Sequence, residues 1–156
     1  MNEPRFHLIH ANIALARGSL DQEIMSGFVQ QVEEINNIAN SSNGFVSQPT
    51  PSDSGAVYSG KWLLNLSVWE SVESLSKFTH SGKHALALDN RNEWFKKQDY
   101  PNYVLFWFHA GNTPKESEIE QRIGHLAQYG ATPYAFNFKQ SFTAQEARQY
   151  VSKKKA

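Results

Sequence analysis

The stretch that decides the fold is WLLNLSVW at residues 62–69, which runs directly into Glu70 and Ser71. It is rich in branched and aromatic side chains, which favour a β-strand. Serine is a preferred residue at a helix start, so we expect a helix to begin at Ser71. This helix should continue to about Lys97, with a break near residues 81–82. A strand followed at once by a helix is typical of mixed α and β folds.

Four other segments are expected to form strands: 6–14, 44–48, 103–109 and 135–142. The segment 103–109 is the strongest of them, because its side chains are mostly aromatic or branched. The segment 135–142 alternates apolar and polar side chains, so we expect it at the edge of a sheet. The segment 49–60 is rich in Pro, Ser and Gly and is expected to be a loop.

Three other helices are expected, and each has a capping residue at its start: Ser19, Thr113 and Thr143. The helix at Thr113 also has Pro114 in its first turn. Glu116 stands three residues after Thr113, where it completes a capping box. The sequence therefore places a helix start at Thr113.

The resulting order of elements is β-α-β-β-α-β with an added C-terminal helix and strand. This order predicts an α+β, ferredoxin-like fold, in which an antiparallel sheet carries helices on one face. We expect residues 1–156 to be a single domain, because this length suits one hydrophobic core. Residues 143–156 are expected to be a short helical tail.

Composition limits the class of protein. Fifteen basic and fifteen acidic residues give a net charge of +0, whereas proteins that bind nucleic acids usually carry a basic surplus, so no nucleic-acid partner is expected. Cysteine is absent, which excludes disulfides, thiolate metal sites and cysteine nucleophiles. No apolar run is long enough to span a bilayer and no export signal is recognisable, so we expect a cytoplasmic protein without a membrane partner.

The two central strands, 62–69 and 103–109, carry apolar side chains on both faces. A half-exposed antiparallel sheet should instead alternate apolar and polar side chains. Because helices are expected to cover one face only, another protein surface should cover the second. A second copy of the chain, packed sheet against sheet, is the simplest candidate, so we expect a homodimer.

The central part of the chain resembles a known family. The resemblance is carried by LNLSVWES at 64–71, His84, Arg91, the Trp94–Phe95 pair and residues 103–111. These residues are similar to domain of unknown function 3291, a family of the dimeric α/β barrel superfamily. That superfamily also holds the antibiotic-biosynthesis monooxygenases and the haem-degrading monooxygenases. The resemblance extends from about Phe6 to Phe142, and it implies a ferredoxin-like protomer, a back-to-back dimer and a pocket between each sheet and its helices.

The resemblance does not extend to the haem-binding residues of that superfamily. Its haem-degrading members use a strand asparagine, a helix tryptophan and a histidine that ligates the iron. Asn12 matches the asparagine, but alignment on residues 68–69 puts Phe78 at the tryptophan position and Leu88 at the histidine position. His84 could replace the iron ligand only if the helix register shifted. We therefore expect neither haem degradation nor a bound cofactor.

Two polar residues on the helix that follows residue 71 are the candidate catalytic residues. His84 and Arg91 share a helical stripe with Leu88 and Phe95. If this stripe faces a pocket, His84 can act as a general acid or base near neutral pH. Arg91 can then hold a carboxylate, phenolate or enolate. The stripe can equally be a half-exposed helix face on which Arg91 pairs with a neighbouring carboxylate.

A metal site is not expected at the histidine pair His80 and His84. Their spacing puts both on one helix face, but zinc needs a third ligand and no carboxylate lies between them. Seven polar or aromatic residues are instead candidates for substrate binding: Asn12, Asn65, Trp69, His80, Trp94, Trp107 and His109. Polar side chains that converge on one side of an apolar sheet would indicate a ligand site, although most such groups are satisfied within the protein.

These residues favour an uncharacterised small-molecule enzyme that acts on an aromatic or polyketide-like substrate. Cofactor-independent, monooxygenase-like chemistry is conceivable, because a deprotonated, electron-rich substrate can itself react with oxygen. The first alternative is a non-catalytic module that binds a hydrophobic ligand, and the second is a purely structural dimer. The sequence leaves open whether the chain is an enzyme at all.

Overall fold

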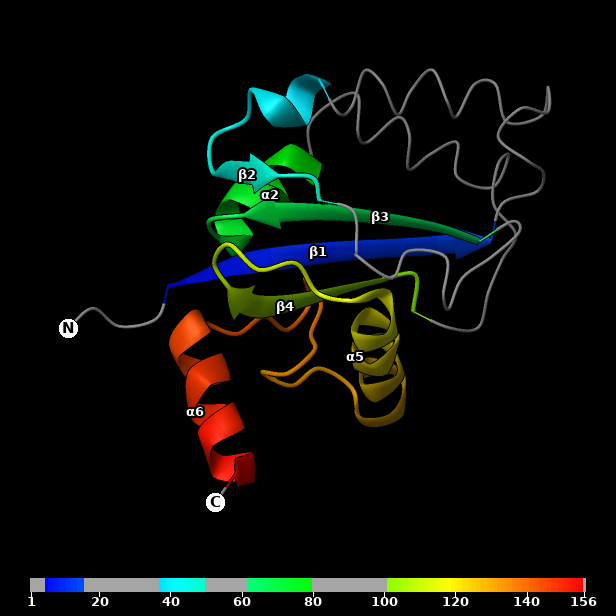
Figure 1. Ribbon diagram of the computed structural model, residues 1–156, viewed down its shortest axis with the longest axis vertical. Coiled ribbons are helices and arrows are strands. Elements are labelled where there is room, and N and C mark those ends of the chain that lie inside the picture. Colours follow the sequence, from blue (N-terminus) through cyan, green and yellow to red (C-terminus); the bar gives the residue numbers. More distant parts are fainter. Residues whose placement is uncertain (1–4, 16–36, 50–61, 80–100, 156) are drawn as a thin grey trace.

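The computed structural model describes residues 5–15, 37–49, 62–79 and 101–155, and four strands in these ranges form one antiparallel sheet (Figure 1). The strands are β1 (Phe6–Leu15), β2 (Phe45–Ser47), β3 (Trp62–Trp69) and β4 (Tyr103–His109). Their order across the sheet is β2-β3-β1-β4, so β1 lies between β3 and β4 and pairs with both. This is the ferredoxin-like order, and the predicted α+β fold class is confirmed.

The helices α2 (Val72–Thr79), α5 (Glu116–Tyr129) and α6 (Ala144–Lys155) accompany the sheet, and residues 37–40 are also helical. The start of α2 is as predicted, because the Ser74 N–H donates a hydrogen bond to the Ser71 hydroxyl. None of the helices in the described ranges is both long enough and apolar enough to cross a membrane.

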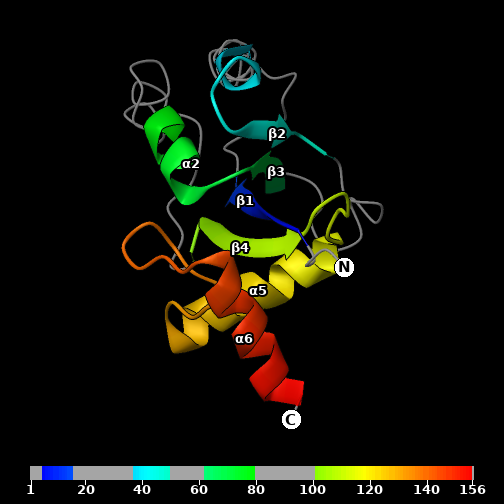
Figure 2. The same cartoon turned by 90° about the vertical axis from the view of Figure 1, so that its left-hand side faces the viewer.

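Both faces of the sheet are covered by elements of the same chain. Neighbouring residues of β1 point to opposite faces, and Leu8 and Ile9 are 0% and 1% exposed. Ile9 belongs to a core that α5 completes with Ile119, whereas Leu8 belongs to a second core that α2 completes with Leu75. Figure 2 shows α2 on one side of the strands, with α5 beginning on the other side. We call these two sides of the sheet the α5 face and the α2 face.

This arrangement corrects the premise from which we predicted a homodimer. We expected that a second copy of the chain would have to cover the second sheet face. Instead, α5 covers it with Ile119, Ile123 and Leu126, which pack against residues of β1, β3 and β4. The apolar pattern of the strands is therefore explained within one chain, and it no longer requires a partner.

The three predicted helix caps have different outcomes, and the one at Ser19 lies outside the described residues. At α6 Thr143 caps the helix as predicted: the Thr143 N–H donates to the Glu146 carboxylate, and the Glu146 N–H donates to the Thr143 hydroxyl. At α5 the prediction is wrong, because Lys115 has an extended backbone and the helix begins only at Glu116. Glu116 is buried at the start of the helix, with 2% of its surface exposed.

The predicted edge strand over residues 135–142 is also wrong. Only Phe136 pairs with β4, through two backbone hydrogen bonds with Leu105 of 2.8 and 2.9 Å. Beyond this pair, the Phe138 N–H donates to the Tyr103 hydroxyl rather than to a backbone carbonyl. We call residues 131–142 the crossing segment, because Ala135 is buried on the α5 face and Phe136 on the α2 face.

Gly44 is placed where only glycine fits. Its φ is +83°, and its carbonyl accepts a hydrogen bond of 2.7 Å from the Glu70 N–H at the end of β3. A Cβ atom on Gly44 would collide with the Ser74 side chain on α2. The turn before β2 therefore needs glycine for its backbone conformation and also for its close approach to α2.

We predict that Gly44→Ala lowers the free energy of unfolding by about 2–4 kcal/mol, which combines left-handed backbone strain with a steric overlap. Gly111→Ala is the matched control, since Gly111 has a φ of +88° and open space around it. The control should lose only the strain contribution of about 1–2 kcal/mol. Urea denaturation measures both variants, and equal losses would contradict the predicted overlap with Ser74.

Candidate functional site

The strand register places the predicted polar residues of the sheet on one face. Residues that lie directly opposite each other on neighbouring strands point to the same side. Asn12 of β1 lies between Asn65 of β3 and Tyr103 of β4. His10, two residues earlier on β1, therefore also points to this side, which is the α2 face. The register therefore places Asn12, Asn65, Tyr103 and His10 on one face of the sheet.

The remaining predicted site residues of the sheet share this face as well. Leu8 of β1 pairs with Trp69 on β3 and with Trp107 on β4, and Phe6 pairs with His109. The predicted catalytic residues His84 and Arg91, together with His80 and Trp94, lie outside the described residues. Their part in a site stays a prediction.

The middle of the α2 face is closed. Trp69 is 0% exposed, and its indole N–H donates a hydrogen bond of 2.9 Å to the hydroxyl of Ser67. Its ring lies 5.4 Å from the ring of Phe45 and 5.1 Å from that of Phe78. In this structure, the Trp69 indole is therefore a satisfied core group beneath α2 and presents no free polar atom to a ligand.

The two ends of the α2 face are too far apart to form one small site. Phe6, which pairs with His109, and Asn12 are six residues apart on β1, a separation of roughly 20 Å. His109 is exposed, and its ring lies 4.7 Å from the Phe6 ring. The Trp107 indole N–H donates to the Phe142 carbonyl at 2.7 Å. A small ligand that contacts Asn12 therefore cannot also contact His109.

The end of the α2 face at Asn12 is less buried than its middle at Trp69. Asn12 and Tyr103 are half-buried and Asn65 is exposed. Among the described residues, none hydrogen-bonds to the side-chain amides of Asn12 or Asn65. The Tyr103 hydroxyl accepts from the Phe138 N–H at 3.1 Å, and within the described part of the chain its own proton has no acceptor. These three side chains form a row with unused hydrogen-bonding capacity, which we call the polar row.

Aromatic rings border the polar row. The Tyr103 ring lies 5.5 Å from that of Phe138 and 5.8 Å from the His10 imidazole. The rings of His10 and Phe138 are 6.4 Å apart. Such spacings are typical of aromatic groups in contact, so the polar row adjoins a cluster of flat side chains. The arrangement suits a flat molecule that carries an oxygen substituent.

The candidates predicted from the sequence did not include His10, Tyr103 and Phe138. His10 stands two residues before Asn12 on a strand, so both must share a face, and this alternation could have added His10 to the candidates. Tyr103 enters the polar row only through the register between β1 and β4. Phe138 lies beside the polar row because the crossing segment places it there, and no pattern in the sequence indicates this position.

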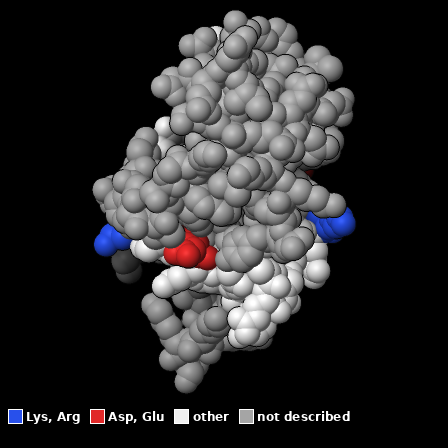
Figure 3. Space-filling view, turned by 90° about the vertical axis from the view of Figure 1, so that its right-hand side faces the viewer, with Lys and Arg blue, Asp and Glu red and all other residues white. Residues whose placement is uncertain are grey.

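Charge does not mark a site on the face shown in Figure 3. The described part of this face carries separate acidic and basic side chains, with no basic stripe. Within the described ranges, no group of three His, Asp or Glu side chains could hold a metal ion. Burial lowers the pKa of His7 below its ordinary value, and Arg5 lowers it further, whereas Glu70 opposes the shift. His7 pairs with Phe108 on the α5 face, away from the polar row.

A groove of about 310 Å³ lies outside the sheet, between residues 38–43 and α2. Glu73 and Lys77 border it, and Phe78 forms part of its wall. The Phe78 ring also packs on Trp69, so this groove and the closed middle of the α2 face share one wall. None of the site residues predicted from the sequence lines this groove.

Residues 7–153 match the family described as Domain of unknown function (DUF3291). The chain belongs to this family. The predicted membership is therefore confirmed over nearly the whole chain, and all of the polar row lies within the matched residues. No protein of curated function matches the chain.

Several solved structures are similar to this DUF3291 chain. A conserved protein from Methanosarcina mazei is 10% identical, with 67% of this chain and 92% of that chain covered and a TM-score of 0.49. A protein of unknown function from Nitrosomonas europaea is 8% identical, with coverage of 72% and 96% and a TM-score of 0.47. SnoaB from Streptomyces nogalater, a cofactor-independent oxygenase, is 12% identical, with coverage of 70% and 98% and a TM-score of 0.45. These likenesses assign no activity to this chain.

We predict that Ser67→Ala lowers the free energy of unfolding by about 1–3 kcal/mol, because the buried Trp69 N–H loses its acceptor. In a Trp69→Phe background, which has no such N–H, the same substitution should have little effect. Urea denaturation of both single variants and the double variant gives the coupling energy. Losses that simply add would show that the two side chains are energetically independent.

Proposed function

We propose that this chain binds a small, flat aromatic molecule with an oxygen substituent at the polar row, and that it acts on this molecule as an enzyme. The observation that carries the proposal is the position of Asn12 between Asn65 and Tyr103, at the less buried end of the α2 face. Polar groups in such a place need partners, and among the described residues these side chains leave hydrogen-bonding capacity unused.

The chemistry of the row indicates which ligand atoms it would hold. An asparagine amide donates and accepts, so Asn12 and Asn65 can bind a carbonyl, a hydroxyl or a phenolate oxygen. The Tyr103 hydroxyl accepts from the Phe138 N–H, which leaves its proton for an oxygen of the ligand. The rings of His10 and Phe138 offer apolar area to the flat part of the same molecule.

The reaction we propose is cofactor-independent oxygenation of an electron-rich aromatic or polyketide-like substrate. Molecular oxygen is the oxidant, and the deprotonated substrate supplies the electrons. One oxygen atom replaces the two hydrogens of an activated substrate CH2 group as a carbonyl oxygen, and the other oxygen atom leaves with these hydrogens as water. The protein would contribute a base and would stabilise the substrate anion away from bulk water. His84 and Arg91 are our sequence-based candidates for these two roles. His10 is the described imidazole beside the polar row, and it is a further candidate for the base.

We predict that the chain binds 1-naphthol more tightly than naphthalene, because only the naphthol can hydrogen-bond to the polar row. Asn12→Ala should weaken naphthol binding by about tenfold, the loss expected for one hydrogen bond in a partly buried site. Binding of naphthalene should change little in this variant. Titrations followed by NMR measure all of these affinities.

Asn112→Ala is the matched control for this test, because Asn112 is exposed in the turn after β4 and lies outside the polar row. It should leave naphthol binding unchanged. Equal affinity for the two probes, or a loss in the control as large as in Asn12→Ala, would remove the polar row from the proposed site.

An oxygen electrode separates the enzyme from a non-catalytic binding module. With 1,8-dihydroxyanthrone as an electron-rich probe, an enzyme should raise oxygen uptake above the rate in buffer, and Asn12→Ala should lower this gain. If naphthol still binds while uptake stays at the rate in buffer, the chain binds its ligand without oxygenating it. That outcome favours the hydrophobic-ligand-binding alternative.

We also propose a homodimer, for which the support is now the family resemblance rather than the apolar strand faces. A dimer of this chain would have to use a surface other than the part of the sheet covered by α5. Light scattering at micromolar concentration should give twice the chain mass of 17.7 kDa. A mass of one chain would contradict the proposed dimer and leave the proposed site unaffected.

A further inference from the structure

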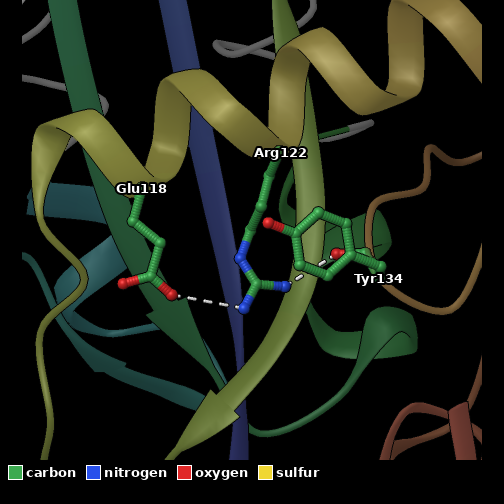
Figure 4. Close-up of polar contacts among 3 residues, drawn as sticks. All are labelled: Glu118, Arg122 and Tyr134. Carbon is green, nitrogen blue, oxygen red and sulfur yellow. Dashed lines mark hydrogen bonds and ion pairs between the residues drawn. The ribbon is translucent and has the colours of Figure 1, made fainter. Parts of the chain in front are cut away.

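Arg122 of α5 is a charged group within an apolar core. Its side chain is 12% exposed, and Figure 4 shows it extending from α5 toward Glu118 and Tyr134. The guanidinium carbon lies 4.3 Å from the centre of the Phe106 ring and 4.3 Å from that of the Tyr134 ring. Burial lowers the pKa of this guanidinium from its ordinary value, and Tyr134 and Glu118 oppose the shift.

The hydrogen bonds of Arg122 are directed to the crossing segment and along its own helix. One terminal nitrogen donates to the Tyr134 carbonyl at 2.7 Å, and the other lies 3.3 Å from a carboxylate oxygen of Glu118. The Nε atom is buried and has no partner among the described residues. The bond to Tyr134 is short and charge-assisted, so it should be the stronger of the two. It holds the crossing segment at the point where that segment leaves the α5 face.

From Tyr134 the chain passes around the edge of β4 to the α2 face. Phe136, two residues later, makes its paired backbone hydrogen bonds with Leu105 and is 0% exposed. Phe138, two residues further, donates its N–H to the Tyr103 hydroxyl of the polar row. A short, hydrogen-bonded stretch therefore connects the Arg122 guanidinium to the Phe138 ring, which borders the polar row.

We propose that Arg122 is a positioning residue for the polar row, although it lies on the opposite side of the sheet. It fixes Tyr134, and through the crossing segment it sets where Phe138 lies against Tyr103. Loss of the hydrogen bond between Arg122 and Tyr134 weakens the hydrogen bond from the Phe138 N–H to Tyr103, and it shifts the Phe138 ring relative to the polar row. The effect on ligand binding rests on the proposed function, whereas the effect on the crossing segment does not.

The first experiment measures amide hydrogen exchange by NMR in Arg122→Met, which keeps an unbranched chain but removes the donors. The amides of Phe136 and Phe138 should exchange about tenfold faster, which corresponds to loss of one charge-assisted hydrogen bond. The amide of Ile119, which donates to Lys115 within α5, should change much less. An equal increase at Ile119 would indicate general destabilisation and overturn the proposal.

Glu118→Gln is the matched control, because Glu118 is the partner of Arg122 that does not belong to the crossing segment. It should leave the exchange of Phe136 and Phe138 unchanged. Arg122→Lys serves if Arg122→Met does not fold, since a lysine can still donate to the Tyr134 carbonyl. Lysine should then restore most of the protection of both amides. Exchange as slow in Arg122→Met as in the natural chain would also overturn the proposal.

The second experiment measures binding of 1-naphthol to the same variants. Arg122→Met should weaken it by about threefold to tenfold, Arg122→Lys by less, and Glu118→Gln not at all. Faster exchange at Phe138 with unchanged naphthol affinity would overturn the link between Arg122 and the site. If the natural chain binds no naphthol, the proposed function fails by itself, and the exchange measurements still decide whether Arg122 holds the crossing segment.

Discussion

The central strand β1 buries apolar side chains on both of its faces, and most of the structure depends on this. Leu8 and Ile9 are neighbours in sequence and are both almost fully buried, in different cores. Burial of each such side chain contributes about 1.5–3 kcal/mol, so neither face of β1 can be left open without a large loss. One chain must therefore supply two layers over one sheet. Helix α2 supplies the first, and α5 supplies the second from the part of the chain that follows β4.

Because the described helices cover the middle of the sheet on both faces, the candidate site among the described residues lies where this cover ends. The α2 face is sealed over Trp69 and Leu105, both 0% exposed, and it opens toward Asn12 and Asn65. The hydrogen bonding of the polar groups changes along the face in step with burial. The hydroxyl of Ser67, in the sealed part, is used by the Trp69 indole, whereas the amides in the open part have no hydrogen-bonding partner among the described residues. The position of the candidate site is thus a consequence of how far the covering layer extends.

Much of the fold could be predicted because its signals are local. The strands β3 and β4 have the bounds that their branched and aromatic residues indicate, and the capping box at Thr143 forms as its spacing predicts. The errors occur where the backbone departs from the local signal. The Thr113 cap fails because Lys115 has an extended backbone, so the helix begins only at Glu116. The strand over 135–142 fails because the hydroxyl of Tyr103 and the indole of Trp107 take its backbone groups in place of a ladder.

The candidate site was only partly predictable for the same reason. Alternation along a strand shows that His10 and Asn12 share a face, but it does not show what lies beside them on the next strand. A shift of one residue between β1 and β4 would have put Val104 next to Asn12 in place of Tyr103 and turned the aromatic hydroxyl to the α5 face. That register is set by the two buried cores, in which Phe106 must meet α5 while Leu105 meets the crossing segment. Apolar packing in the two cores therefore brings the residues of the polar row together. The identities of these residues alone do not predict that they lie side by side.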